Sequence, residues 1–332
     1  MGQPCRHVSV SQKSRVGGLQ SPGVKVLLHY HAGPRLRTEL EALSTDGIEL
    51  SWAPEGDETA LFAALPEAEA LLHVLEPVTA ERMERAPKLK LIQKLGVGVN
   101  TIDLEAARQR GIAVANLPGV NATAVAEMTL GLLLAVLRRI PTLDRDTRDG
   151  TGWSDPPDPE QLGEVAGKTV GLVGYGDIAR RFGTIVEAMG ATVVHHRREP
   201  DGASLPLDDL LANADIVSVH LPLSDETRDL LNADRLGRMK RGSILLNTGR
   251  SGIVDESALA DLLRSGHLAG AGVDVFASEP VSITSPLLTL DNVVVTPHVA
   301  WLTADTLLTC VRLGVENCRR IASGEEPSNR IA

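Results

Sequence analysis

The sequence predicts an α/β protein of two doubly wound domains, each with a parallel sheet covered by helices. Short aliphatic runs alternate with helix-length segments along most of the chain, which is typical of parallel sheets. The 332 residues exceed what one hydrophobic core usually serves, so two domains are expected. Aromatic residues make up only 2% of the chain. Ala, Val and Leu must therefore fill the cores, which favours helices packed on aliphatic strands.

The bulk composition narrows the classes of partner. The formal net charge is −10 and no long Lys/Arg run occurs, which argues against nucleic acid. The three cysteines, Cys5, Cys310 and Cys318, show neither metal-ligand spacing nor a disulfide framework, so we expect no metal site and a cytoplasmic location. No apolar stretch reaches membrane-spanning length, and the polar residues 1–23 are expected to form a disordered leader.

The first series of strands and helices begins at Val24. Its aliphatic runs predict strands, and the mixed segments between them predict helices. The expected strands are residues 24–28, 48–52, 70–74, 89–94 and 112–115, and two of the expected helices are residues 36–43 and 104–110. This unit ends near Leu117, where Pro118 and Gly119 follow.

A long Ala- and Leu-rich segment, residues 123–140, connects the two units and predicts one helix. Asn121 is its expected N-cap, and Pro141 is its expected stop. Residues 144–166 are rich in Asp, Pro and Gly, which predicts a loop or arm.

The second series begins at Thr169 and contains six further aliphatic runs. The expected strands are residues 169–173, 192–196, 216–220, 243–246, 270–273 and 293–295. Helix-length segments separate them, and a last helix is expected over residues 304–323. The number and alternation of these elements predict Rossmann-like or flavodoxin-like doubly wound domains.

A glycine-rich turn follows the first strand of the second unit and begins a helical pattern. It reads Gly174, Tyr175, Gly176, Asp177 and Ile178. In this context the first glycine permits a tight turn, and the second lets the backbone approach a dinucleotide pyrophosphate at the helix N-terminus. An ordinary strand-turn-helix connection is the alternative, but the placement of the turn favours a phosphate site.

Coenzyme preference is predicted from the residues about 23 positions further on, where an NAD enzyme usually has an acidic residue. The chain has Arg197 and Arg198 there, and the next carboxylate is Glu199. Guanidinium groups bind a 2′-phosphate that an Asp would repel, so we expect NADP(H) to be preferred and NAD to remain usable. The alternative is that these arginines stack on the adenine or face solvent.

Several separate motifs resemble the D-2-hydroxyacid dehydrogenase family, in particular its glyoxylate and hydroxypyruvate reductases. In order they are residues 218–223 (SVHLPL), 246–252 (LNTGRSG), 272–276 (GVDVF), 279–280 (EP) and 296–298 (TPH). The resemblance extends from about Val24 to the C-terminus. It implies a substrate domain of residues 24–120 plus 301–332, a nucleotide domain of residues 121–300, an active-site cleft between them, and a homodimer paired through residues 123–153.

Three residues match the catalytic positions of that family. His298 would be the general acid in reduction and the base in oxidation, and Glu279 would orient its imidazole and stabilise the charged form. Arg250 would hold the substrate carboxylate and polarise the carbonyl group. Each of these residues alone could be structural, since a lone His, an Arg at a strand end and a Glu-Pro turn are all common. Their joint spacing in a chain with a glycine turn favours a catalytic role.

The resemblance also implies supporting residues. Val97 and Gly98 would hold the substrate carboxylate through backbone amides, with a plain turn as the alternative, and Trp301 would wall the pocket. Asp274 would lie near the nicotinamide amide, with a structural strand-end Asp as the alternative. The remaining expected coenzyme contacts are Leu221, Pro222, Thr227, Thr248, Gly249, Arg250, His298 and Ala300.

The sequence therefore predicts an enzyme that reduces a small 2-oxo acid such as glyoxylate or hydroxypyruvate with NADPH. Glu279 argues against the formate-oxidising branch of the family, which has Gln at this position. Two alternatives stay open. One is a dinucleotide-sensing interaction protein with the same fold and residues, and the other is a dehydrogenase for a lactate-like or phosphoglycerate-like 2-hydroxy acid.

Overall fold

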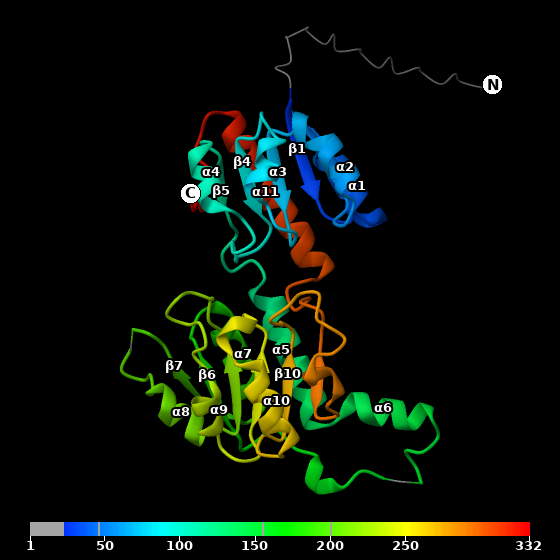
Figure 1. Cartoon of the computed structure of the whole chain (residues 1–332), viewed down its shortest axis with the longest axis vertical. Coiled ribbons are helices and arrows are strands. Elements are labelled where there is room, and N and C mark those ends of the chain that lie inside the picture. The colour runs from blue at the N-terminus through cyan, green and yellow to red at the C-terminus, as the bar shows by residue number, and fades with distance from the viewer. Residues whose placement is uncertain (1–22, 46, 155, 200) are drawn as a thin grey trace, which may run out of the picture.

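The computed structural model describes residues 23–332 except residues 46, 155 and 200, and it contains two parallel sheets that lie end to end along the long axis (Figure 1). The predicted leader lies outside the described residues, apart from Gly23. The first sheet is built from the N-terminal part of the chain and the second from the middle part. Two parallel-sheet α/β domains, as predicted, are thus confirmed.

The first sheet has five parallel strands in the order β2-β1-β3-β4-β5. These are β1 (Val24–His29), β2 (Ile48–Ala53), β3 (Ala70–His73), β4 (Leu91–Lys94) and β5 (Ala113–Ala115). This is the flavodoxin-like order, in which the chain reverses direction across the sheet between the first and third strands. The helices of this domain are α1 (Pro34–Leu43), α2 (Glu58–Ala64), η1 (Leu65–Glu67), α3 (Ala80–Glu84), α4 (Leu104–Gln109) and α11 (Ala304–Ala322).

Both faces of the first sheet are covered by helices, which explains why most residues of its central strands are aliphatic. Val26 and Leu28 of β1 face a core that includes α1 and α11. Leu27, between them, faces a second core that includes α2, α3 and α4. The alternation of side chains along one strand therefore supplies both cores.

The second sheet has six parallel strands in the order β11-β10-β9-β8-β6-β7. These are β6 (Thr169–Val173), β7 (Thr192–His196), β8 (Ile216–Val219), β9 (Ile244–Asn247), β10 (Gly270–Val273) and β11 (Val293–Val295). A single bridge between His195 and Ser204 extends the sheet beyond β7. The direction of the chain across the sheet reverses between β6 and β8, and doubly wound sheets bind their ligands at the carboxyl ends of the strands at this point.

Helices cover both faces of the second sheet as well. One face packs against α5 (Ala122–Leu137) and α7 (Asp177–Ala188). The other packs against α8 (Leu207–Asn213), α9 (Ala233–Gly237) and α10 (Glu256–Arg264). The remaining elements are α6 (Ile140–Arg148) and the short helices η2 (Pro159–Gln161), η3 (Ser251–Ile253) and η4 (Pro286–Thr289).

The chain passes between the two sheets twice. Helix α5 follows the first sheet in sequence but packs on the second, and α11 follows the second sheet but packs on the first. Gly314 allows α11 to pack closely on the first sheet, because a Cβ atom at this position would lie only 3.1 Å from the side chains of Leu72 and Leu95. The domain boundaries named above stay a prediction.

Every strand predicted from the sequence is present, with ends within two residues of those expected. The prediction for the connecting region is partly wrong. The long helix ends at Leu137, Arg139 takes a left-handed conformation with φ +49°, and Pro141 lies in the first turn of a new helix instead of ending the old one. Proline is well tolerated there, because the first turn of a helix has no acceptor for its missing N–H. Residues 144–148 are helical and not a loop.

No helix among the described residues combines the length and the apolar character that a membrane span requires. The cellular location stays a prediction.

Candidate active site

The glycine turn lies between the carboxyl end of β6 and the start of α7. Gly174 has φ +94°, and a Cβ atom there would lie 2.6 Å from the carbonyl oxygen of His220, so glycine is required. At Gly176, which precedes α7, an added Cβ would meet nothing within 4 Å. The helix N-terminus is thus open to an approaching anion, and the turn fits a dinucleotide pyrophosphate. Ala179, in the first turn of α7, is fully buried.

The side chain of Tyr175 forms a stacked pair with His195 at the end of β7, with ring centroids 3.8 Å apart. Beyond this pair, the two arginines that predict the coenzyme each face a carboxylate. Arg197 Nη1 lies 3.4 Å from Oδ2 of Asp201, and Arg198 Nη1 lies 2.7 Å from Oε2 of Glu226. Neither acid was predicted from the sequence; the position of Asp201, four residues after Arg197, was the available signal.

The other expected coenzyme contacts lie at the carboxyl ends of β8 and β9. Thr227 donates to the carbonyl oxygen of Pro222 at 2.6 Å and so fixes the segment after β8. Thr248 shares a buried hydrogen bond of 2.9 Å with Thr129 of α5. Gly249 lies close to the backbone of Leu221, since a Cβ atom on Gly249 would be 3.3 Å from its carbonyl oxygen. Asp177, the residue of the glycine turn that begins α7, forms an ion pair with Arg180 of the same helix.

The structure brings His298 and Glu279 together although they are 19 residues apart. Nδ1 of His298 lies 2.6 Å from Oε2 of Glu279, and since a carboxylate only accepts, the ring nitrogen donates. The other carboxylate oxygen accepts from the amide of Phe276 at 3.0 Å. Burial raises the pKa of Glu279, but these hydrogen bonds and the charge of Arg250 outweigh it and hold the pKa below its usual value. Nε2 is therefore the ring nitrogen left for a substrate.

Asp274 fixes the segment that carries His298. Its carboxylate accepts from Thr296 Oγ1 at 2.6 Å and from the amides of Val299 and Ala300, each at 2.9 Å. Its carbonyl oxygen accepts from the amide of His298 at 2.8 Å. Burial raises the pKa of Asp274, although the hydrogen bonds act against this. These contacts give Asp274 a structural role, and its expected place near the nicotinamide amide stays a prediction.

The backbone of His298 is left-handed, with φ +54°. Few residues other than glycine take this conformation, and such positions cluster at functional sites, where neighbouring contacts hold them. The hydrogen bonds from Asp274 supply that support here. In this conformation the imidazole of His298, which follows β11, forms its hydrogen bond with Glu279, which follows β10.

Arg250 connects the two domains. It follows β9, and a Cβ atom added to Gly98 of the first domain would overlap its guanidinium. Arg250 Nη1 donates to the carbonyl oxygen of Gly249 at 2.8 Å, and Asn247 donates to the carbonyl oxygen of Arg250 at 3.1 Å. Burial lowers the pKa of Arg250, while the charge of Glu279 raises it. The two predicted substrate-binding elements are therefore in contact.

The loop of residues 95–100, after β4, offers backbone amides without protein acceptors. Its first part is fixed, because Leu117 donates to the carbonyl oxygen of Gly96 and Asn116 donates to that of Val97 at 2.7 Å. The N–H groups of residues 96–100 make no hydrogen bond to any described residue. Consecutive free amides of this kind form an anion-binding nest.

Trp301 is buried in the core of the first domain, where it packs against Tyr30 with ring centroids 6.4 Å apart. Only 8% of the residue is exposed. Its role as a wall of the substrate pocket therefore stays a prediction, and the structure describes Trp301 as part of the core of the first domain.

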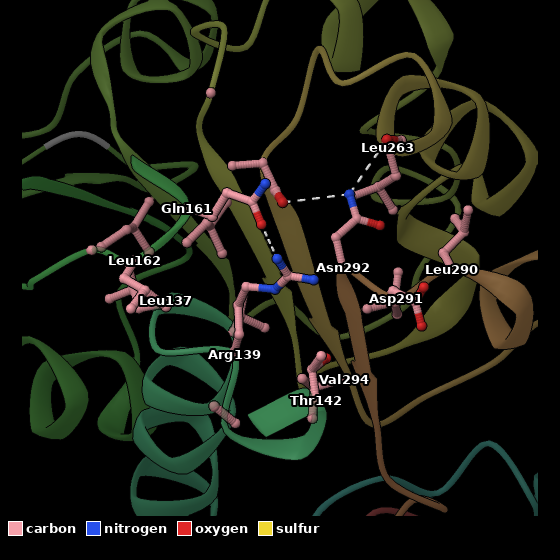
Figure 2. Close-up of a pocket in the computed structure, with 18 of the residues that line it drawn as sticks. Leu137, Arg139, Thr142, Gln161, Leu162, Leu263, Leu290, Asp291, Asn292 and Val294 are labelled. Carbon is pink, nitrogen blue, oxygen red and sulfur yellow. Dashed lines mark hydrogen bonds between the residues drawn. The ribbon is translucent and has the colours of Figure 1, made fainter. Parts of the chain in front are cut away.

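A cavity of about 650 Å³ lies at the opposite end of the second sheet (Figure 2). It is lined by the end of α5, the start of α6 and residues before β8, β9 and β11, among them Arg139, Gln161 and Asn292. Arg139 donates to Gln161 across it. Because it lies at the amino ends of the strands, it is separate from the residues that the sequence predicts for chemistry.

Residues 130–300 match the model of the D-isomer specific 2-hydroxyacid dehydrogenase NAD-binding domain. Among known proteins, the D-3-phosphoglycerate dehydrogenase of Mycobacterium tuberculosis is 44% identical over 78% of this chain and 50% of its own length. The glyoxylate reductase of Aeropyrum pernix is 39% identical over 84% of this chain and 87% of its own length.

Among solved structures, the NADPH-dependent glyoxylate/hydroxypyruvate reductase of Sinorhizobium meliloti is 31% identical, with a TM-score of 0.81 over 94% of this chain and 98% of its own. The protein belongs to the D-isomer specific 2-hydroxyacid dehydrogenase family. It has a nicotinamide dinucleotide-binding domain. The chain spans about half the length of the phosphoglycerate dehydrogenases that it matches.

Proposed function

We propose that the protein is an NAD(P)-dependent D-2-hydroxyacid dehydrogenase that reduces a small 2-oxo acid such as glyoxylate or hydroxypyruvate. The observation that carries this proposal is the hydrogen-bonded pair of His298 and Glu279 at the carboxyl end of the sheet that holds the glycine turn. Arg250 lies at the same end, in contact with the loop of free amides. These are the groups that reduction of a 2-oxo acid requires.

Each residue has a defined part in the proposed reaction. The reduced coenzyme supplies a hydride to C2 of the 2-oxo acid. His298 gives a proton from Nε2 to the carbonyl oxygen, and its Nδ1–H keeps the ring oriented through Glu279. Arg250 polarises the carbonyl group with a permanent charge. The product is a 2-hydroxy acid, and oxidation reverses each step.

NADP(H) is the proposed preferred coenzyme. Arg197 and Arg198 follow β7, the position that meets the adenosine ribose in doubly wound sheets. The similar enzyme from Sinorhizobium meliloti is named NADPH-dependent. The carboxylates of Asp201 and Glu226 would have to give way to a 2′-phosphate, and both ion pairs are exposed enough to be weak.

A screen of 2-oxo acids tests the proposal, with oxidation of NADPH and NADH followed by absorbance. Glyoxylate and hydroxypyruvate are expected to be reduced. Because phosphoglycerate dehydrogenases are among the relatives, D-3-phosphoglycerate oxidation with NAD⁺ belongs in the same screen. Tight dinucleotide binding without turnover of any acid would contradict the proposal and favour the dinucleotide-sensing alternative.

The proposed partner is a second copy of the chain. Helix α6 projects away from the second sheet, and none of its residues is buried (Figure 1). Trp153, shortly after it, is 90% exposed. An exposed arm of this kind suits pairing across a homodimer. Sedimentation equilibrium tests this: the dimer mass is expected, and Trp153→Ser with Ile140→Ser should shift it toward the monomer.

A further inference from the structure

Lys94, the last residue of β4, is a buried cation beside the predicted substrate site. It is 8% exposed and lies directly before the loop of residues 95–100. Its side chain runs past that loop, since a Cβ atom on Gly96 would lie 3.8 Å from its Cε atom. Its ammonium group donates to the carbonyl oxygen of Val74. The proposed function gives this residue no role.

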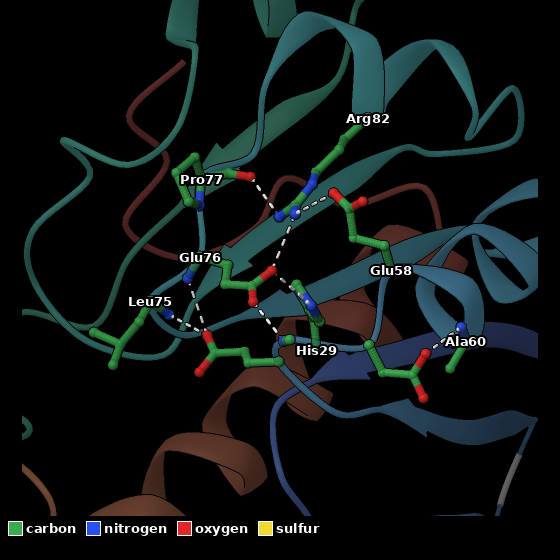
Figure 3. Close-up of polar contacts among 10 residues, drawn as sticks. His29, Glu58, Ala60, Leu75, Glu76, Pro77 and Arg82 are labelled. Atoms are coloured by element: carbon green, nitrogen blue, oxygen red, sulfur yellow. Dashed lines mark hydrogen bonds and ion pairs between the residues drawn. The ribbon is translucent and has the colours of Figure 1, made fainter. Parts of the chain in front are cut away.

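The ammonium group of Lys94 makes no ion pair with any described carboxylate, although the charge of Glu55 acts on it from beyond ion-pair distance. Glu55 accepts the amides of Leu75 and Glu76 at 2.7 and 3.0 Å. Glu76 lies 3.0 Å from Arg82, as Figure 3 shows. A buried charge without a counterion is costly, so residues of this kind tend to meet a bound anion.

The second cation at this place is Arg250, whose charge is close enough to lower the pKa of Lys94. Burial is the larger cause, and although the charge of Glu55 acts in the opposite direction, the pKa of Lys94 is lowered to about 8. The buried Lys94 and the half-buried Arg250 thus both lie beside the free amides of the 95–100 loop. A single anion between them would offset the repulsion of the cations and occupy the amides.

We propose that Lys94 binds the carboxylate of the 2-oxo acid substrate together with the amides of residues 96–98, which leaves Arg250 free to face the carbonyl oxygen. This inference rests on the proposed function. Lys94 would then set the affinity for the substrate anion, whereas His298 and Glu279 would set the rate of proton transfer.

Three variants separate this role from a structural one. Lys94→Gln keeps a hydrogen-bond donor for Val74 but removes the charge, Lys94→Arg keeps the charge, and Lys90→Gln changes an exposed lysine of the same segment. We expect Lys94→Gln to raise the KM for glyoxylate roughly ten- to hundredfold with kcat within about threefold, since a hydrogen bond to a charged group is lost. Lys94→Arg should restore most of the affinity, and Lys90→Gln should match the wild type.

The pH dependence of KM gives a second readout. Arg250 stays charged, burial raises the pKa of Cys310 to about 12, and burial holds the pKa of His73 well below its usual range. Lys94 is therefore the group of this cluster whose charge is expected to change between about pH 7 and about pH 10. The wild-type KM should rise as pH passes about 8. Lys94→Arg should lack this rise.

Binding of oxamate to the coenzyme complex, measured by calorimetry, separates the two proposals. Suppose that the wild type reduces 2-oxo acids but the KM of Lys94→Gln is unchanged. The Lys94 proposal is then wrong and the proposed function stands, whether or not the variant has also lost kcat and melting temperature. If no acid is reduced but oxamate binds and Lys94→Gln weakens it at least tenfold, the anion site stands without the proposed function. Absence of both turnover and oxamate binding overturns both.

Discussion

Gly98 of the first domain and Arg250 of the second are in direct contact, so closely that a Cβ atom on Gly98 would overlap the Nη2 atom of the guanidinium. Arg250 is mostly buried and cannot move outward without losing its hydrogen bond to Gly249. The contact therefore fixes the relation between the free amides of the 95–100 loop and the predicted polarising group. The position of Arg250 in the second domain therefore requires a glycine at position 98 in the first domain.

Gly98→Ala should lower kcat/KM for the 2-oxo acid at least roughly tenfold, because displacing a positioning arginine by about 1 Å is costly in catalysis. Binding of the coenzyme, measured by fluorescence titration, should be unchanged, since the glycine turn belongs to the other domain. Gly237→Ala is the matched control, because a Cβ atom there meets nothing within 4 Å. A Gly98→Ala variant with wild-type kcat/KM would show that Arg250 does not act at this contact.

His298→Ala should remove nearly all turnover while coenzyme binding persists. A positioned general acid contributes about 10² to 10⁴ to the rate, and Nε2 of His298 is the ring nitrogen that Glu279 leaves free. The measurements are kcat from initial rates and the coenzyme Kd. His267→Ala is the control, because His267 pairs with the carbonyl oxygen of Met239 far from this pair. Turnover retained in His298→Ala would assign the proton to another group.

The fold was predictable because both faces of each sheet are buried. Strands such as β1 and β8 then consist mostly of aliphatic residues, and their ends are visible in the sequence. Helix α6 was not predictable in the same way. It has no buried residue, so no apolar stripe separates it from a loop, and its sequence of Asp, Arg and Thr follows a proline.

The candidate site was predictable where its residues form contiguous motifs and not where contacts come from different strands. The glycine turn and the His298 segment are short motifs with a local geometry. The environment of Lys94 depends on Val74, Glu55 and Arg250, which three other segments supply. Spacing along the chain carries no information on such neighbours, and a lysine at a strand end reads as an ordinary surface charge.

Activity should persist at acidic pH, because the pKa of Glu279 lies below its usual value of 4.5. A carboxyl group with a lowered pKa keeps its charge as pH falls, so its hydrogen bond to His298 is lost only below that value. We expect kcat/KM for reduction to show no decline from protonation of Glu279 between pH 7 and 4.5. An acid limb above pH 4.5 that disappears in Glu279→Gln would contradict this. Rates measured after return to neutral pH control for unfolding.

Arg197→Ala should lower kcat/KM for NADPH more than for NADH. The ion pair of Arg197 with Asp201 is long, at 3.4 Å, and both side chains are more than a third exposed or nearly so, so the guanidinium is available to a 2′-phosphate. A charge-assisted hydrogen bond to a phosphate is worth about 1.5–3 kcal/mol, which corresponds to a loss of roughly ten- to hundredfold with NADPH. NADH lacks the phosphate, so kcat/KM for NADH should change by less than about threefold.

Arg241→Ala, at an exposed position before β9, is the control. Equal losses with the two coenzymes would mean that Arg197 contacts the adenine or only supports the loop after β7, and the NADP preference would then have to come from Arg198.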